Sequence, residues 1–226
     1  MPTRIMIADD HDIVRQGLRQ ILSTQPDLEV CGEASDSATA FACARKGICD
    51  VLVLDLAMPG RGGLEVLSEL HRLQPSLPVL VMSMYGEEEF AVRVLKSGAA
   101  GYIAKGASAD ELVKAIRTVA AGRRYVSTRV GEQLAAQLFA PATTKPHTQL
   151  SDREFQVFIR LARGEAATAV ANELSLSIKT VSTYRARVLE KMAFRTNADL
   201  VRYALEHGLM PTGQTVPTPA SASADA

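Results

Sequence analysis

The sequence predicts an α/β domain built on a five-stranded, doubly wound parallel sheet, followed by a smaller all-α domain with four helices. Two observations predict the first domain: short, nearly continuous apolar runs, and helical patterns that separate each run from the next. Such runs are typical of buried parallel strands in a sheet with helices on both faces. The second domain is predicted by four helical segments within about 65 residues near the C-terminus.

Strands and helices of the first domain are expected in strict alternation. The predicted strands cover residues 4–8, 28–34, 51–54, 78–82 and 101–104. The first helix ends near Ser23, and the second begins at the capping residues 35–37 and runs to about Lys46. Apolar stripes mark the last three helices, in order, at Leu64, Leu67, Leu70 and Leu73, at Phe90, Val94 and Leu95, and at Leu112, Val113, Ile116, Val119 and Ala120.

The C-terminal helices are expected at residues 152–162, 166–174, 178–192 and 198–206. A three-residue turn separates the second from the third, and Ser177 is placed to cap the third. A short helix, a tight turn and a longer basic helix form the helix-turn-helix pattern. The predicted boundaries are 1–122 for the α/β domain, 123–146 for a short helix around 131–139 and a linker, 147–210 for the helical domain, and 211–226 for a disordered tail.

Composition indicates a cytoplasmic protein without membrane insertion. The 226 residues carry no net charge, so overall electrostatics does not indicate a nucleic-acid partner. No apolar run approaches the ~20 residues that cross a membrane, and the first predicted strand leaves no room for a signal peptide. Cys31, Cys43 and Cys49 are odd in number and lack a Cys-x-x-Cys spacing, which suits a reducing compartment.

Polar side chains follow four predicted strands at their carboxyl ends. They are Asp9 and Asp10, Asp55, Ser83, and Lys105. Open parallel sheets bind their ligands at this edge. Clustered carboxylates suit Mg²⁺, and a carboxylate beside Mg²⁺ can attack phosphorus to form an aspartyl phosphate. Each Asp alone could be an ordinary helix cap, but the joint pattern predicts a magnesium-dependent phosphoryl-transfer site.

The third C-terminal helix is basic. Between residues 178 and 195 the charged side chains are Lys179, Arg185, Arg187, Lys191 and Arg195 against Glu190. A positive helix is what contact with nucleic-acid phosphates requires. A solvated helix face would carry the same charge, so charge alone leaves both interpretations open.

Four ordered motifs carry a family resemblance. Those of the first domain are Ala8-Asp9-Asp10-His11, Asp55-Leu56-Ala57-Met58-Pro59-Gly60, and the segment 96–105. The motif of the second domain runs from Lys179 to Met192 and contains Thr-Val-Ser-Thr-Tyr. Together they resemble a two-component response regulator of the NarL/FixJ family, with a flavodoxin-like receiver domain and a LuxR-type helix-turn-helix domain. The Thr-Val-Ser-Thr-Tyr form is similar to BvgA, EvgA and GacA-like members.

The resemblance implies that Asp55 accepts a phosphoryl group from a sensor histidine kinase. The ligands that it implies for Mg²⁺ are Asp9, Asp10, Asp55 and the backbone carbonyl of Ala57. Lys105 and Ser83 would contact the phosphoryl oxygens, and Tyr102 would move inward as Ser83 swings toward them. Because phosphorylation adds about −1.5 to −2 charges, we expect the last two strands and the helix from Glu87 to Ser97 to shift.

The resemblance also implies that phosphorylation controls homodimerisation and sequence-specific DNA binding, with RNA polymerase as a further partner. The residues expected at the DNA are Lys179, Thr180, Ser182, Thr183, Tyr184, Arg185, Ala186 and Arg187. Ser182, Thr183 and Ala186 are expected at base edges and the basic residues at phosphates. For Tyr184, packing at the edge of the domain and contact with the DNA backbone are equal alternatives.

The sequence departs from the family at two places. The segment 165–171 is rich in alanine, which predicts fewer contacts from that helix to the DNA backbone. Ala193 stands where relatives usually have Gly, at a helix end that favours a left-handed backbone. A non-glycine residue there costs on the order of 1 kcal/mol.

Two other classes of protein share part of this pattern. Phosphatases of the haloacid-dehalogenase type carry a second Asp two residues after the nucleophile, where this chain has Ala57. We therefore expect a transcription factor rather than an enzyme, with slow self-dephosphorylation only. An interaction module that does not bind DNA is the third class, and alanine variants of Arg185 and Lys179 would distinguish it.

Overall fold

The computed structural model describes residues 1–56, 58, 63–83, 87–128, 130–132, 135, 145–174 and 176–209. Its first part is a five-stranded sheet in the order β2-β1-β3-β4-β5. The strands are β1 Thr3–Ala8, β2 Leu28–Ala34, β3 Val51–Asp55, β4 Val79–Ser83 and β5 Gly101–Ala104. Each neighbouring pair is parallel, which confirms the predicted sheet.

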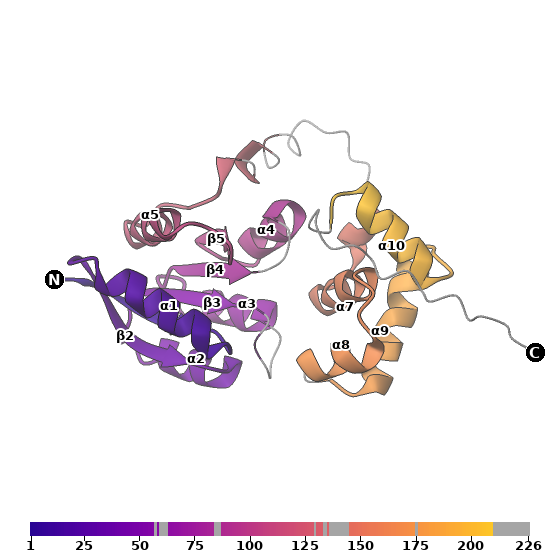
Figure 1. Ribbon diagram of the computed structural model, residues 1–226, viewed down its shortest axis with the longest axis horizontal. Coiled ribbons are helices and arrows are strands. Elements are labelled where there is room, and N and C mark those ends of the chain that lie inside the picture. The colour runs from indigo at the N-terminus through magenta and orange to yellow at the C-terminus, as the bar shows by residue number, and fades with distance from the viewer. Residues whose placement is uncertain are drawn as a thin grey trace, which may run out of the picture.

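Helices cover both faces of the sheet (Figure 1). On one face lie α1 Asp12–Ser23 and α5 Ala109–Ala120, and on the other α2 Ser37–Ala44, α3 Gly63–Leu73 and α4 Glu87–Lys96. Ile5 and Ile7 of β1 belong to the first buried layer and Met6 to the second, as the alternation of side chains along a strand requires. Because both layers are buried, the strands are almost wholly apolar.

Two local features set the helix ends. Asp36 accepts a hydrogen bond from the backbone N–H of Thr39 at 2.9 Å and so caps α2, which ends two residues before the predicted Lys46. Gly98 ends the turn after α4 with a φ of +104°, where a Cβ would lie 2.3 Å from the ring of His71. The turn into β5 therefore needs a glycine.

In the C-terminal part, the described residues 145–174 and 176–209 form one short 3₁₀ helix and four α-helices, close to the predicted ranges. They are η1 Pro146–Gln149, α7 Asp152–Ala162, α8 Ala167–Glu173, α9 Ile178–Lys191 and α10 Asn197–Glu206. The shared core includes Phe158, Val181, Val188 and Leu200, all fully buried. Val181 and Val188 lie on α9, and their burial explains why this side of the helix is apolar while the other side is basic.

The ends of α9 match two predictions. The hydroxyl of Ser177 accepts the backbone N–H of Thr180 at 3.0 Å, which confirms the predicted cap. Ala193, just after the helix, has a φ of +56°, so the left-handed backbone expected at this position is present. Phe194 N–H donates to the carbonyl of Leu189 at 2.8 Å and closes the helix end.

The two parts of the chain meet where α4 faces η1 and α7 (Figure 1). The Arg93 guanidinium donates from Nη2 to the backbone oxygen of His147 at 2.9 Å. Its central carbon lies 4.5 Å from the centroid of the Phe155 ring. Arg93 therefore links a helix beside the predicted phosphorylation site to the helical part.

Some predictions fall outside the described residues. They concern most of the helix at 131–139, the linker before Lys145, and the tail. Pro146, predicted as the last linker residue, begins η1. Among the described helices, none combines the length and apolarity that a membrane span needs.

Candidate functional site

The polar residues predicted to converge do lie at one edge of the sheet. Asp55 and Ser83 are the last residues of β3 and β4, Asp9 and Asp10 follow β1, and Lys105 follows β5. The parallel register pairs Ala8 with Leu54 and Ser83 with Ala104, so these strand ends are level with one another. Strand register alone thus brings together residues that are up to 96 positions apart in the chain.

Lys105 joins two of the carboxylates. Its Nζ lies 2.7 Å from Asp9 Oδ2 and 2.8 Å from Asp55 Oδ2. Both Asp side chains are buried, with 0% and 1% exposure. Burial alone would lower the pKa of Lys105, but the charges and hydrogen bonds of Asp55 and Asp9 outweigh it and raise the pKa above its usual value. The ammonium group therefore offsets part of the repulsion between these carboxylates.

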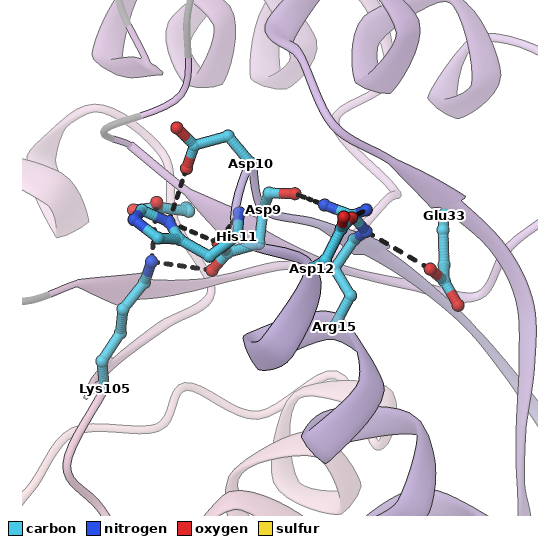
Figure 2. A network of polar contacts seen from close by, with 8 residues as sticks. Asp9, Asp10, His11, Asp12, Arg15, Glu33 and Lys105 are labelled. Atoms are coloured by element: carbon cyan, nitrogen blue, oxygen red, sulfur yellow. Dashed lines mark hydrogen bonds and ion pairs between the residues drawn. The ribbon is translucent and has the colours of Figure 1, made fainter. Parts of the chain in front are cut away.

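His11 and Arg15 also contact the acidic loop, and sequence analysis assigned a role to neither. The His11 ring Nδ1 lies 2.8 Å from Asp10 Oδ1 and 3.2 Å from Asp9 Oδ1 (Figure 2). Arg15 donates from Nη1 to the backbone oxygen of Asp9 at 2.7 Å and pairs with Glu33. The signal that could have found them is their position at the start of α1: His11 is the N-cap residue directly after the acidic pair, and Arg15 lies one turn further on.

The donor set fits a divalent cation. Asp9, Asp10, His11 and Asp55 each offer one ligand atom, and these atoms lie within 4.8 Å of one another. The buried Asp10 Oδ1 has the His11 ring nitrogen at 2.8 Å as its polar contact. Carboxylate oxygens are the ligands that Mg²⁺ prefers, so the three predicted acidic ligands fit this ion. The fourth predicted ligand, the carbonyl of Ala57, lies outside the described residues.

Ser83 and Tyr102 occupy adjacent strands and are both buried, with 1% and 2% exposure. The β4–β5 register pairs Tyr102 with Val81, two residues before Ser83. The inward movement of Tyr102 that accompanies a swing of Ser83 stays a prediction.

The predicted DNA-contacting residues are spread over the outer side of α9. Lys179, Ser182, Thr183, Ala186 and Arg187 are exposed, whereas Thr180, Tyr184 and Arg185 are half-buried. Tyr184 packs against the core of the helical part, in line with the packing alternative. The Nε of Arg185 donates to Asn197 of α10 at 2.7 Å, a contact that the sequence did not predict.

Comparison with protein families identifies both parts of the chain. Residues 5–117 match the response regulator receiver domain. Residues 148–204 match the bacterial regulatory proteins of the luxR family. The chain belongs to the response regulators of the NarL/FixJ family. It has a receiver domain and a LuxR-type DNA-binding domain, as the motifs predicted.

Similar response regulators cover nearly the whole chain. Response regulator GacA of Pseudomonas aeruginosa is 38% identical over 208 residues, which are 92% of this chain and 97% of GacA. Response regulator UvrY of Escherichia coli is 35% identical over 91% of this chain and 94% of UvrY. These similarities agree with the predicted resemblance to GacA-like members.

Solved structures of RcsB from Salmonella are also similar. One matches with a TM-score of 0.68 and 28% identity over 91% of this chain and 98% of RcsB. Another is RcsB bound to promoter rprA in the presence of the phosphomimetic BeF₃⁻, with a TM-score of 0.63 and 27% identity over 90% of this chain and 98% of RcsB. These matches confirm the α/β receiver followed by a helical domain.

Proposed function

We propose that this response regulator accepts a phosphoryl group on Asp55 from a sensor histidine kinase and thereby controls its own dimerisation and DNA binding. The observation that carries the proposal is the position of Asp55, buried at the end of β3 and paired with Lys105 at 2.8 Å. A carboxylate in an acidic cluster beside one fixed ammonium has the partners that phosphoryl transfer needs.

In the transfer, a carboxylate oxygen of Asp55 forms a bond to phosphorus while the bond from phosphorus to the kinase histidine breaks, and the released imidazole takes up a proton. Asp9, Asp10 and Asp55 would hold Mg²⁺, which would neutralise negative charge on the phosphoryl oxygens. Lys105 would move its ammonium from Asp9 and Asp55 onto a phosphoryl oxygen. Ser83 would donate its hydroxyl to another.

The proposed switch depends on Ser83 and Lys105, because both would move to contact the phosphoryl oxygens. Ser83 is the last residue of β4, and Lys105 follows β5. Movement of their side chains toward a phosphoryl group would therefore shift the ends of both strands. Tyr102, buried on β5, would fill the space that Ser83 leaves. The helix that follows β4 is α4, and through Arg93 it contacts the helical domain. Loss of that contact would free the DNA-binding domain.

For DNA, we propose that α9 enters the major groove with Ser182, Thr183 and Ala186 toward base edges. Lys179 and Arg187 would bind phosphates, because both are exposed on this helix. RcsB, similar to this chain over both domains, has been solved bound to promoter DNA. Arg185 would reach DNA only after leaving Asn197.

Further parts of the proposal rest on the family. The two domains would span residues 1–122 and 147–210, with a linking segment at 123–146 and a tail at 211–226. The family matches at 5–117 and 148–204 support these boundaries. The phosphorylated form would be a homodimer that acts with RNA polymerase, and Asp55 would lose its phosphoryl group only slowly by itself. A cytoplasmic location is supported by the free thiols of Cys31, Cys43 and Cys49.

The decisive experiment is the intact mass of the full chain after incubation with Mg²⁺ and a small phosphodonor, beside Asp55→Asn. We expect wild type alone to gain one base-labile phosphoryl group. The matched control is Asp10→Asn, which keeps Asp55 but removes a proposed magnesium ligand and should slow the gain. Equal gain by wild type and Asp55→Asn would refute the assignment of Asp55.

A further inference from the structure

We propose that Arg15 is a positioning residue of the cation site, and that it makes the site prefer Mg²⁺ over Ca²⁺ by fixing the loop after β1. The proposal deepens the proposed function and rests on its magnesium site, but not on phosphoryl transfer. It comes from the contacts of one guanidinium group, which lies between the acidic loop and Glu33 of β2 (Figure 2).

The Arg15 side chain uses each of its three nitrogens for a different partner. Nη1 donates to the backbone oxygen of Asp9 at 2.7 Å, and Nε donates to Glu33 Oε2 at 3.3 Å. Nη2 pairs with Asp12 in the first turn of α1. These contacts leave the side chain 13% exposed. A guanidinium presents its donors in a rigid planar fork, which the ammonium group of a lysine does not reproduce.

The contact from Arg15 completes the anchoring of Asp9. The backbone N–H of Asp9 donates to the carbonyl of Ala34 at 3.1 Å, and its backbone oxygen accepts from Arg15. Its Oδ1 accepts the backbone N–H of His11 at 2.9 Å, while its Oδ2 pairs with Lys105 at 2.7 Å. Of the two backbone anchors, the one from Arg15 is made by a side chain. A substitution can therefore remove it while the other stays.

The anchored oxygen belongs to the peptide unit that joins two proposed magnesium ligands, Asp9 and Asp10. Because a peptide unit is planar, a contact that fixes its oxygen also fixes the direction in which the chain continues to Asp10. Asp55, the third acidic ligand, is fixed separately as the last residue of β3. Movement of the Asp9–Asp10 peptide would therefore shift two carboxylates relative to the third.

The rigidity of the ligands then determines which ion is preferred. Mg²⁺ requires near-ideal octahedral geometry with bonds of about 2.0–2.1 Å, whereas Ca²⁺ accepts flexible geometry with bonds of about 2.3–2.6 Å. A looser loop should therefore weaken Mg²⁺ binding more than Ca²⁺ binding. If Arg15 acted only through its charge, its removal would instead strengthen the binding of both ions, since a positive charge near the acids repels a cation.

The test is ion binding by the full chain without any phosphodonor. Isothermal titration calorimetry gives the Kd of Mg²⁺ and of Ca²⁺ for wild type, Arg15→Ala and Arg15→Lys. We expect both variants to weaken Mg²⁺ binding about tenfold, as is typical for residues that orient metal ligands, and Ca²⁺ binding less than about twofold. Arg15→Lys is the decisive variant, because it keeps the charge and loses the planar fork.

Arg19→Ala is the matched control. Arg19 lies one turn further along α1 and donates from Nε to the same Glu33 at 2.8 Å. In the part of the chain that the structure describes, it makes no hydrogen bond to Asp9, so its loss should change neither Kd. Glu33→Gln approaches the same link from β2, because it weakens the contact that orients Arg15. It should also weaken Mg²⁺ binding more than Ca²⁺ binding.

The outcomes separate this inference from the proposed function. Unchanged Mg²⁺ binding in Arg15→Lys, or equal weakening of both ions, would overturn the role of Arg15. Urea unfolding shows whether each variant is folded, and if Arg15→Ala is not, Arg15→Lys and Glu33→Gln decide the question. Absence of Mg²⁺ binding by wild type would overturn the magnesium site itself and this inference with it. Phosphoryl gain on Asp55 is measured separately by mass, so the inference can fail while the proposed function stands.

Discussion

The guanidinium carbon of Arg93 lies 4.5 Å from the centroid of the Phe155 ring. This cation–π contact joins α4 of the receiver domain to α7 of the DNA-binding domain. The same side chain donates to the backbone oxygen of His147 at 2.9 Å. His147 is itself buried and bonded through Nδ1 to the hydroxyl of Tyr203 at 2.6 Å. Arg93 therefore contacts a well-fixed part of the DNA-binding domain, and its contacts can restrain that domain.

Arg93→Ala should release this restraint. Loss of a cation–π contact worth about 1 kcal/mol would raise the affinity of the unphosphorylated chain for duplex DNA about fivefold. Fluorescence anisotropy at fixed salt measures the change, and Arg93→Lys is the matched control because it keeps the charge but not the planar group. Unchanged or weaker binding by Arg93→Ala would show that the contact does not inhibit.

Phosphate contact by α9 can be tested through salt dependence. Lys179→Ala and Arg187→Ala should each weaken duplex binding and reduce the slope of log K against log salt by about 0.9. Arg202→Ala is the control, because Arg202 is an exposed cation on α10 that the proposal leaves away from DNA. A slope that stays the same in the α9 variants would contradict the groove assignment.

Lys105→Met should destabilise the receiver domain. The substitution leaves Asp9 and Asp55 buried without their ammonium partner, which costs ~3 kcal/mol of unfolding free energy. Added Mg²⁺ should restore part of the loss, because a bound cation stabilises the folded state. Urea unfolding in EDTA and in excess Mg²⁺ measures both effects. Equal losses in the two conditions would argue against a cation beside Lys105.

Ala193→Gly should stabilise the DNA-binding domain by up to ~1 kcal/mol. The gain arises because Ala193 has a left-handed backbone with φ of +56°, which glycine adopts without a Cβ penalty. Glycine also gives the unfolded chain more freedom, so the net gain is smaller than the penalty removed. Thermal unfolding measures it, with Ala198→Gly within α10 as a control that should destabilise.

Acid should destabilise the DNA-binding domain through Glu154. Burial alone would raise the pKa of this carboxyl, but the hydrogen bonds from Lys191 and Ser151 outweigh it and hold the pKa below its usual value. A pKa that is lower in the folded state contributes stability that is complete above about pH 4.3 and is lost as the pH falls. Between about pH 5 and pH 3, the unfolding free energy of Glu154→Gln should fall less than that of the wild-type chain. An identical pH profile would remove Glu154 as the cause.

The sequence by itself determined the elements and the edge at which the receiver site lies. Apolar runs with a polar residue at their end are local patterns, so Asp55, Ser83 and Lys105 could be placed on strand ends before any contact was known. The cap at Ser177 and the left-handed Ala193 were predictable for the same reason. Each depends on a few neighbouring residues.

Only the tertiary structure decided how residues from different elements meet. The contacts of the His11 ring nitrogen with Asp9 and Asp10 depend on how the loop after β1 enters α1. The bond of Arg185 to Asn197 depends on the packing of α9 against α10. Arg93 on Phe155 joins residues 62 positions apart in the chain. Such contacts arise from packing between whole elements, and no local periodicity records which side chains that packing brings together.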